Sequence, residues 1–187
     1  MVEQGKIVVA VKELLKAIGE DPEREGLQQT PFRVAKFWSE FMDYRDDNLG
    51  TTFNGIQTNQ LVAVSGVRVW TLCEHHLLPF FCDLTVAYLV KDRVIGISKL
   101  ARIAKLMAHR LNVQERLVDN IAQTVKEKTG SPDVAVIASG QHLCMSMRGI
   151  KTDAIMVSNV MEGAFRDNHA LRMELLEMVK HNGTTAI

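Results

Sequence analysis

Cys73-Glu74-His75-His76 is the stretch of this chain in which the most reactive side chains stand together. A second such group, His142-Leu143-Cys144, follows later in the sequence. Thiolate sulfur and imidazole nitrogen are ligands that zinc prefers. Cys73 and His76 have the spacing of a ligand pair, and Cys144 would supply a third ligand. Three protein ligands leave one coordination position open, so this set predicts a catalytic zinc ion rather than a structural one.

Two other interpretations of these cysteines stay open. The thiols could be packed as small hydrophobic groups, or Cys73 and Cys144 could form a disulfide. The neighbouring imidazoles of His75 and His142 favour the metal site, because hydrolysis at a metal needs groups that transfer protons near neutral pH. For the remaining cysteine, Cys82, we expect a buried packing role.

Gly96-Ile97-Ser98-Lys99-Leu100-Ala101-Arg102 predicts an anion site at the start of a helix. We expect Ser98 to be the N-cap, with Lys99 and Arg102 in the first turns. The free N–H groups and partial positive charge of a helix N-terminus attract anions, and two cations added at that end favour a phosphate ligand. Arg148 could join this site. The alternative is an ordinary capped helix whose charged side chains are solvated.

Asn112-Val113-Gln114-Glu115 precedes a further predicted helix and has two interpretations. Asn112 at the N-cap and Glu115 at the third helical position resemble a capping box. Alternatively, Gln114 and Glu115 hydrogen-bond a base, because a carboxylate can accept from the N–H and the adjacent amino group of guanine at once.

The chain has 187 residues, of which 47% are hydrophobic and 24% are charged, as in ordinary globular proteins. This length predicts one domain with room for an appendage. The 22 basic and 22 acidic residues cancel, which gives no support for non-specific binding to nucleic acid or to a membrane. The sequence has no apolar run of the length of a membrane span or a signal peptide, and three cysteines are too few for a disulfide scaffold. We therefore expect a soluble cytoplasmic protein.

Hydrophobic periodicity changes near residue 60. Residues 1–60 predict an N-terminal helical extension, in which Thr30 is the N-cap of the second helix and Pro31 its first residue. Residues 61–187 predict the order β-β-α-α-β-β, an α+β arrangement with an antiparallel sheet and helices on one face. The Cys-Glu-His-His stretch then connects the first two strands, where a rigid sheet can orient loop side chains.

The end of this second region allows three more expectations. Residues 140–150 form a strand, on which His142 and Cys144 leave the same face because they are two residues apart. Asp167 caps the final helix. Gly183 lies past the end of that helix.

Four motifs together resemble those of type I GTP cyclohydrolase: Cys-Glu-His-His-Leu-Leu-Pro-Phe (73–80), Gly-Ile-Ser-Lys-Leu-Ala-Arg-Ile (96–103), Gln-Glu-Arg-Leu (114–117) and His-Leu-Cys-Met-Ser-Met-Arg-Gly (142–149). Four motifs in order are far more specific than one. The resemblance implies the tunnelling fold (T-fold) with an N-terminal helical extension, and a homodecamer of two stacked pentamers with active sites between subunits. It also implies that GTP and water are converted to 7,8-dihydroneopterin triphosphate and formate.

The resemblance carries roles over to single residues. It implies that zinc is held by Cys73, His76 and Cys144. It implies that protons are transferred by His75 and His142, with Ser98 and Gln114 also taking part in catalysis. It implies a guanine anchor at Glu115 with Gln114, and contacts to the ribose and triphosphate from Ser98, Lys99, Arg102 and Arg148.

The chain departs from the family pattern in three places. Residues 151–159 are more apolar than the usual Ser/Thr-rich run, Cys82 stands where glycine is usual, and Thr71 stands where serine is common. These changes bear on substrate affinity and rate more than on reaction type. Two other functions stay open: a zinc-dependent hydrolase of another purine nucleotide, and a non-catalytic relative that binds nucleotide.

Overall fold

The computed structural model describes residues 1–46, 49, 52–54, 59–91 and 93–181. The chain divides into two units, Met1–Arg45 and Asp46–Ile187. Strand β1 (Thr52–Asn54) pairs antiparallel with β4 (Arg93–Ile95) inside the second unit. The boundary at residue 61, which the change in hydrophobic periodicity suggested for a catalytic domain of residues 61–187, stays a prediction.

The first unit is a pair of helices, α1 (Gln4–Ala17) and α2 (Thr30–Met42). Helix α1 ends just before Gly19, which has φ +88°, a left-handed conformation that suits glycine. Pro31 lies in the first turn of α2, where its missing N–H costs no helical hydrogen bond. Thr30 is already helical and Gln29 is the N-cap, so the predicted start differs by one residue.

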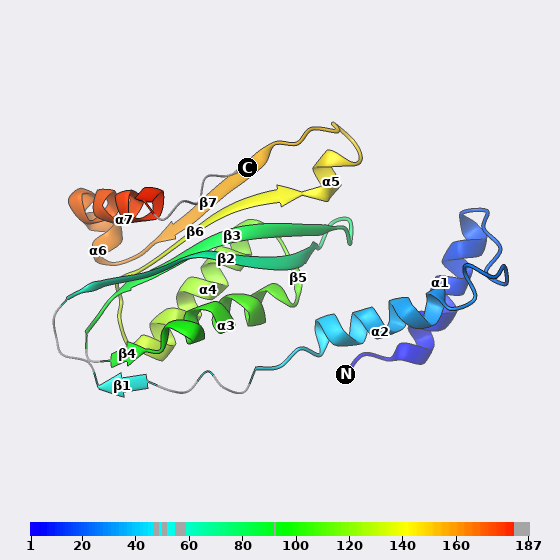
Figure 1. The fold of residues 1–187 in the computed structure, drawn as a ribbon, viewed down its shortest axis with the longest axis horizontal. Helices are drawn as coiled ribbons and strands as arrows, with labels where there is room; N and C mark the ends of the chain where they lie inside the picture. The colour runs from blue at the N-terminus through cyan, green and yellow to red at the C-terminus, as the bar shows by residue number, and fades with distance from the viewer. Residues whose placement is uncertain (47–48, 50–51, 55–58, 92, 182–187) are drawn as a thin grey trace. The chain divides into compact units, whose positions relative to one another are not determined.

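The second unit is built on a five-stranded sheet in the order β5-β2-β3-β6-β7 (Figure 1). Its four long strands pair antiparallel: β2 (Leu61–Cys73), β3 (Pro79–Leu89), β6 (Val134–His142) and β7 (Ile155–Met161). The short strand β5 (Leu111–Asn112) adds to the edge of β2 in parallel. The sheet is therefore mixed, and its antiparallel part confirms the predicted α+β class.

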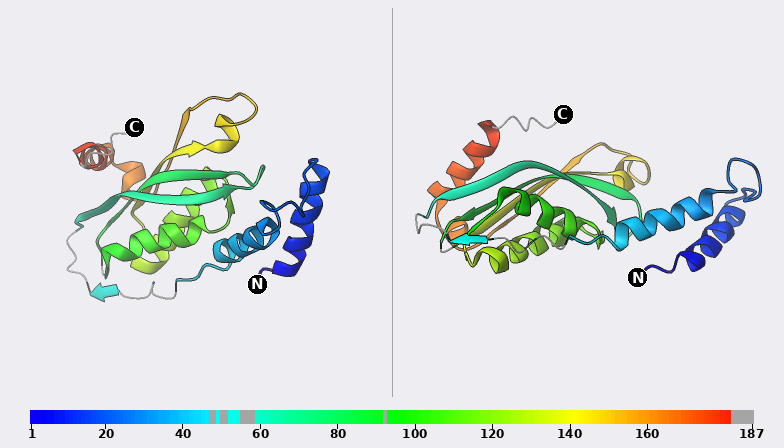
Figure 2. Two further views of the ribbon diagram at one scale, coloured as in Figure 1. Left: turned by 45° about the vertical axis from the view of Figure 1, so that its right-hand side comes forward. Right: turned by 60° about the horizontal axis from the view of Figure 1, so that its bottom comes forward.

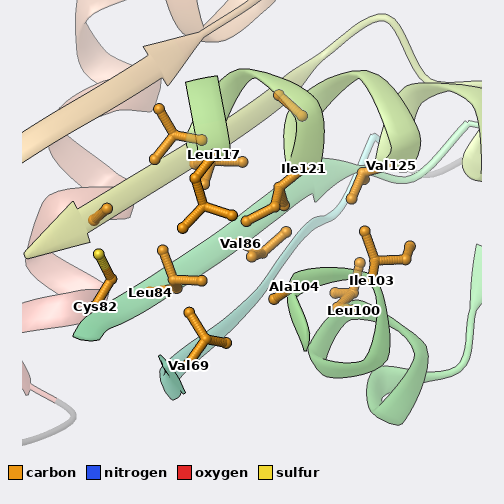
Figure 3. Close-up of a cluster of buried hydrophobic side chains, with 14 of the residues drawn as sticks. Val69, Cys82, Leu84, Val86, Leu100, Ile103, Ala104, Leu117, Ile121 and Val125 are labelled. Atoms are coloured by element: carbon orange, nitrogen blue, oxygen red, sulfur yellow. The ribbon is translucent and has the colours of Figure 1, made fainter. Parts of the chain in front are cut away.

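Helices α3 (Ile97–Ala108) and α4 (Gln114–Thr129) cover one face of this sheet. Alternate residues of β3, among them Cys82, Leu84 and Val86, point into the core beneath these helices (Figure 3). Leu100 and Leu117 meet them from α3 and α4, and all of these side chains are buried. The alternate side chains of the strand and the apolar faces of the two helices thus form one core.

The opposite face of the sheet is also covered, which corrects the expectation of helices on one face only. Helices α6 (Ala164–Asp167) and α7 (His169–His181) bring Phe165 and Leu175 against Ala87 and Ala135. Figure 2 shows the last helix on the side of the sheet opposite α3 and α4. Ala87 and Ala135 alternate with the residues that face α3 and α4, so they lie on the other side of the sheet. The sequence predicted this final helix but did not indicate which face of the sheet it packs against.

Two boundary predictions near the end of the chain were wrong. Strand β6 stops at His142 and continues into a one-turn helix, α5 (Leu143–Ser146), so residues 140–150 are not one strand. Helix α7 is capped by Asn168, whose Oδ1 accepts hydrogen bonds from the backbone N–H groups of Ala170 and Leu171, and not by Asp167. Gly183 lies outside the described residues.

None of the helices within the described ranges is both long and apolar enough to cross a lipid bilayer.

Candidate metal and nucleotide site

The Cys-Glu-His-His stretch forms the tight turn from β2 to β3, as the sequence predicted. The backbone N–H of Cys73 donates to Leu78 O at 2.8 Å, and the N–H of Leu77 donates to Cys73 O at 2.8 Å. Leu77 adopts φ +55°, an unusual conformation for a branched residue. These bonds fix Cys73 at the end of a central strand and hold His75 and His76 on the turn.

Three potential metal ligands converge at this turn. One ligand atom each from Cys73, His76 and Cys144 lies within 4.8 Å of the others. Cys73 Sγ is 3.6 Å from His76 Nδ1 and 3.9 Å from His75 Nδ1. Cys144 reaches the cluster from helix α5, which corrects the expectation that it shares a strand face with His142. The three ligands that were predicted from the sequence therefore also lie close together in the structure.

The electrostatics of the cluster suit a cation. Burial raises the pKa of the Cys144 thiol, the neighbouring Cys73 raises it further, and Arg148 opposes the shift. A second sulfur held this close disfavours a thiolate on Cys144, unless a positive charge lies between the two. A divalent metal supplies that charge and deprotonates coordinating thiols, so the donor set fits zinc.

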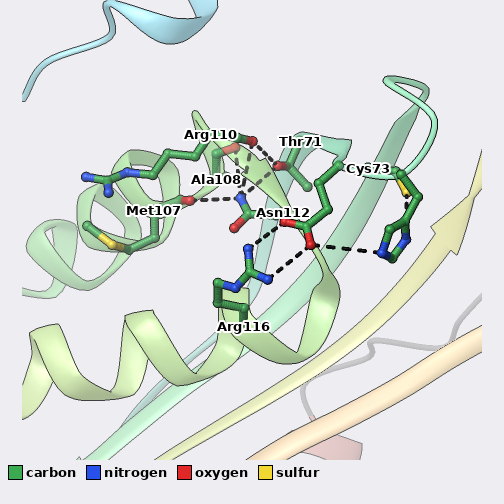
Figure 4. Close-up of polar contacts among 9 residues, drawn as sticks. Thr71, Cys73, Met107, Ala108, Arg110, Asn112 and Arg116 are labelled. Carbon is green, nitrogen blue, oxygen red and sulfur yellow. Dashed lines mark hydrogen bonds and ion pairs between the residues drawn. The ribbon is translucent and has the colours of Figure 1, made fainter.

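Asn112 stabilises the metal turn, the segment of residues 73–78 that carries two of the three potential metal ligands. It is paired with Cys73 in the β5–β2 ladder, and its carbonyl accepts from the N–H of Glu74 at 3.1 Å. Its buried amide nitrogen Nδ2 has four acceptors, shown in Figure 4: Thr71 Oγ1 at 3.0 Å and the carbonyl oxygens of Met107 (3.1 Å), Arg110 (3.3 Å) and Ala108 (3.5 Å). One side chain thus ties β2 to the end of α3.

The capping-box interpretation of this stretch was wrong. Helix α4 begins at Gln114 with Val113 as its N-cap, so Asn112 lies outside the helix and Glu115 is its second residue. Asn112 uses its side chain in the network just described. Glu115 is exposed, and its carboxylate is close enough to His142 for its charge to act on that imidazole.

His142 is held on two sides. Its ring stacks on Phe80 with centroids 4.2 Å apart and planes 11° apart, because the two residues are directly opposite in the β3–β6 ladder. Its Nε2 lies 3.0 Å from Gln114 Oε1. Partial burial lowers the pKa of His142 and Glu115 opposes this shift. The imidazole is therefore fixed in place beside the metal cluster.

The side chain of Gln114 points into the interior of the protein. Only 1% of this residue is exposed. Its Nε2 has three acceptors: Met156 O (3.0 Å), Ser158 Oγ (3.0 Å) and Ala138 O (3.4 Å). Its Oε1 lies against His142. The Gln114 side chain thus contacts a predicted catalytic histidine, and its own amide is engaged by protein groups.

An ion pair beside the turn was not predicted from the sequence. Arg116 binds Glu74 through two nitrogens, at 2.5 and 3.0 Å (Figure 4). The hydrogen bond from Arg116 lowers the pKa of Glu74. Glu74 Oε1 is 3.9 Å from His75 Nε2. Glu74 and Arg116 each belong to one of the four family motifs. No local sequence pattern indicates that two residues so far apart in the chain form an ion pair.

The predicted phosphate residues do not all join the metal cluster. Arg148 lies close enough to Cys144 for its charge to oppose the rise in the pKa of that thiol, which burial causes. Ser98, Lys99 and Arg102 lie at the start of α3, beside β4, whereas the end of α3 leads to β5 and the metal turn (Figure 1). At about 1.5 Å per residue, Ser98 is roughly 15 Å from the end of that helix.

The start of α3 also differs from the prediction. Gly96 is the N-cap and Ser98 is the second helical residue, so Ser98 does not cap the helix. Lys99 is buried, and Ser98 is exposed. Arg102 Nη1 lies 2.9 Å from Asp46 Oδ2. An incoming anion would have to compete with this carboxylate for Arg102.

Comparison with known proteins identifies a family to which the chain is similar. The family described as GTP cyclohydrolase I matches residues 7–180. "GTP cyclohydrolase 1" of Hyperthermus butylicus is 44% identical over 96% of this chain and 92% of its own length, and that of Caldivirga maquilingensis is 44% identical over 96% and 94%. The protein of the same name from Aquifex aeolicus is 41% identical over 96% of this chain and 98% of its own.

Among solved structures, apo archaeosine synthase QueF-Like has 18% identity and a TM-score of 0.44, covering 55% of this chain and 94% of its own. So slight a likeness supports no conclusion about function.

Proposed function

This chain belongs to the GTP cyclohydrolase I family, and from that premise we propose that it converts GTP and water to 7,8-dihydroneopterin triphosphate and formate. The observation that carries the proposal is the meeting of Cys73, His76 and Cys144 beside a fixed imidazole, His142. We propose the T-fold for the second unit, whose antiparallel sheet and two covering helices are compatible with it.

The proposed cofactor is zinc, held by the two thiolates and His76. Zinc bound there would lower the pKa of a water molecule and so supply hydroxide near neutral pH. The exposed position of His76 and the partial burial of Cys144 leave the cluster open on one side, as a catalytic site requires.

His142 is the proposed acid toward guanine. C8 of guanine is a weak electrophile, and protonation of N7 makes it open to attack. Gln114 Oε1 occupies the Nε2 side of His142, so Nδ1 is the nitrogen left to exchange a proton with the substrate. Attack at C8 opens the five-membered ring, and a second hydrolytic step releases formate.

His75 is the proposed proton carrier for the later rearrangement of the opened ribose. Its ring stands on the metal turn and its Nε2 is near Glu74, which Arg116 holds in place. The ion pair thereby restricts how His75 can turn.

Glu115 is the proposed guanine anchor, because its exposed carboxylate lies near His142 at the start of α4, where it is free to accept base N–H groups.

We propose that the triphosphate site is completed by a second copy of the chain. Arg148 lies at the metal end, and Ser98, Lys99 and Arg102 lie at the other end of α3. A ring in which the α3 start of one subunit meets the metal turn of its neighbour would unite them, as expected for a homodecamer of two pentamers. The triphosphate is not cleaved, so these cations position C8 for reaction.

Subunit complementation tests this arrangement. Cys144→Ala and Arg102→Ala should each abolish or greatly reduce formate release when expressed alone. Co-expressed, they should form about a quarter of sites with both residues intact, if each site draws on two copies. Recovery of activity supports the shared site. Mixed oligomers as inactive as the parents, with both variants folded and mixed by mass spectrometry, contradict it.

Product analysis tests the reaction itself. Purified protein incubated with GTP should release formate and yield a pterin that fluoresces after oxidation, in equal amounts. A different purine product would indicate the alternative zinc-dependent hydrolase. Saturable GTP binding without any product would indicate the non-catalytic relative. Either result overturns the proposed activity.

A further inference from the structure

Cys82 lies beside the network that holds His142. It is on β3 and fully buried, and its Sγ is 3.5 Å from Gln114 Oε1. Burial is the main cause that raises its pKa to about 12, with Asp83 contributing, so the group is a thiol and can donate its S–H. Gln114 Oε1 therefore has two neighbours that can donate to it: the thiol and the imidazole.

The orientation of the Gln114 amide follows from its other contacts. Its Nε2 lies against the carbonyl oxygens of Met156 and Ala138, which can only accept hydrogen bonds. The amide nitrogen must therefore be on that side and the amide oxygen on the side of Cys82 and His142. Because Oε1 can only accept, His142 must carry its hydrogen on Nε2 to bond with it.

The packing around this oxygen is tight. Gly140 is directly opposite Cys82 in the β3–β6 ladder. A Cβ at residue 140 would lie 2.9 Å from Cys82 Sγ and 3.1 Å from Gln114 Cδ, and closer still to Oε1. The thiol, the amide and the bare backbone of Gly140 thus fill one small space. Removing the sulfur opens a gap on one side of the Gln114 amide.

We propose that Cys82 is a positioning residue for the reaction: its S–H donates to Gln114 Oε1 and holds that oxygen where it accepts from Nε2–H of His142. The neutral imidazole of His142 is then held with its hydrogen on Nε2, so that Nδ1 can take up a proton and the protonated ring can donate it from Nδ1 to the substrate. This inference rests on the proposed function for its kinetic consequence, but the hydrogen-bond chain can be measured without it.

The kinetic test compares two replacements of the thiol. Cys82→Ala removes the donor and should lower kcat for formate release about fivefold, equal to about 1 kcal/mol, with KM within about twofold of wild type. Cys82→Ser keeps a donor and should restore kcat to within about twofold. We expect kcat to change and KM to stay nearly constant because the tautomer of His142 governs proton transfer rather than substrate binding.

Val86→Ala is the matched control. Val86 lies on the same strand and the same buried face, two residues past Leu84, and its truncation leaves a core cavity away from Gln114. It should lower the melting temperature at least as much as Cys82→Ala and leave kcat unchanged. Equal kcat in wild type, Cys82→Ala and Cys82→Ser would overturn the proposal, as would an equal loss in all three variants.

A spectroscopic test stands apart from activity. Nitrogen-15 solid-state spectra of histidine-labelled protein, with the His142 signal assigned from a His142→Gln sample, report which ring nitrogen carries hydrogen. Wild type and Cys82→Ser should show His142 protonated on Nε2 alone, and Cys82→Ala should show both tautomers. Identical spectra for all three would refute the role of Cys82. Wild type without formate release, but with these spectral differences, would refute only the proposed function.

Discussion

Alanine at residue 140 would test how firmly the Gln114 amide is fixed. The added Cβ would lie 2.9 Å from Cys82 Sγ and 3.1 Å from Gln114 Cδ. Both distances are shorter than ordinary contact, and the neighbours are buried. The Gln114 side chain would have to move away from its partners, among them His142 and the Met156 carbonyl.

The expected cost follows from these contacts. Overpacking a filled core costs about 1–3 kcal/mol. Weakening two or so buried hydrogen bonds adds about 1 kcal/mol each. We expect Gly140→Ala to lower the free energy of unfolding by about 3–5 kcal/mol, or the melting temperature by roughly 6–20 °C for a chain of this size.

Denaturant unfolding followed by circular dichroism measures this change, and Gly96→Ala is a matched control. A Cβ at Gly96 meets only Lys99 Cγ, at 3.7 Å, which is ordinary contact. Its effect should stay below about 1 kcal/mol. A second comparison adds Gly140→Ala to Gln114→Ala, where the clash is relieved and the added cost should fall by at least about 1 kcal/mol. Gly140→Ala with wild-type stability would refute the reasoning.

Other contacts give three more expected outcomes. Glu115→Gln should change stability by less than about 1 kcal/mol, because Glu115 is exposed and is not a cap, yet lower kcat/KM for GTP at least about thirtyfold; wild-type kinetics would remove it as the guanine anchor. Asn112→Ala should destabilise by about 2–4 kcal/mol in urea unfolding, whereas a loss near 1 kcal/mol would suit a mere helix cap. After chelation, a thiol reagent should modify the partly exposed Cys144 in the folded protein faster than the buried Cys82, whose pKa is raised to about 12; equal reaction of these two by mass spectrometry would contradict the burial of Cys82.

The metal cluster was the part of the site most open to prediction from sequence. Cys73 and His76 are neighbours on one turn, so their spacing alone limits their distance. Cys144 could be added because it stands with His142 in the second group of reactive side chains. The turn between two strands followed from the change of hydrophobic period on either side of it.

Other features depended on contacts that no local pattern encodes. Asn112 has the residue type and position of a helix cap, but the β5–β2 ladder uses it instead, so tertiary structure overrode a correct local signal. The role of Gln114 toward the substrate, assigned by its motif, stays a prediction, and no local pattern indicated that its buried amide contacts His142. The separation of Ser98 from the metal turn reflects the direction of α3 along the sheet, which motif order does not reveal.

The claim that Cys73, His76 and Cys144 hold a catalytic zinc ion is tested most directly on Cys144→Ala. Elemental analysis and formate release from GTP should be measured on the same sample, beside wild type and with the fold checked by circular dichroism. We predict about one zinc per chain and active turnover in wild type, and loss of both in Cys144→Ala. A folded Cys144→Ala protein that keeps its full zinc content would contradict the assignment.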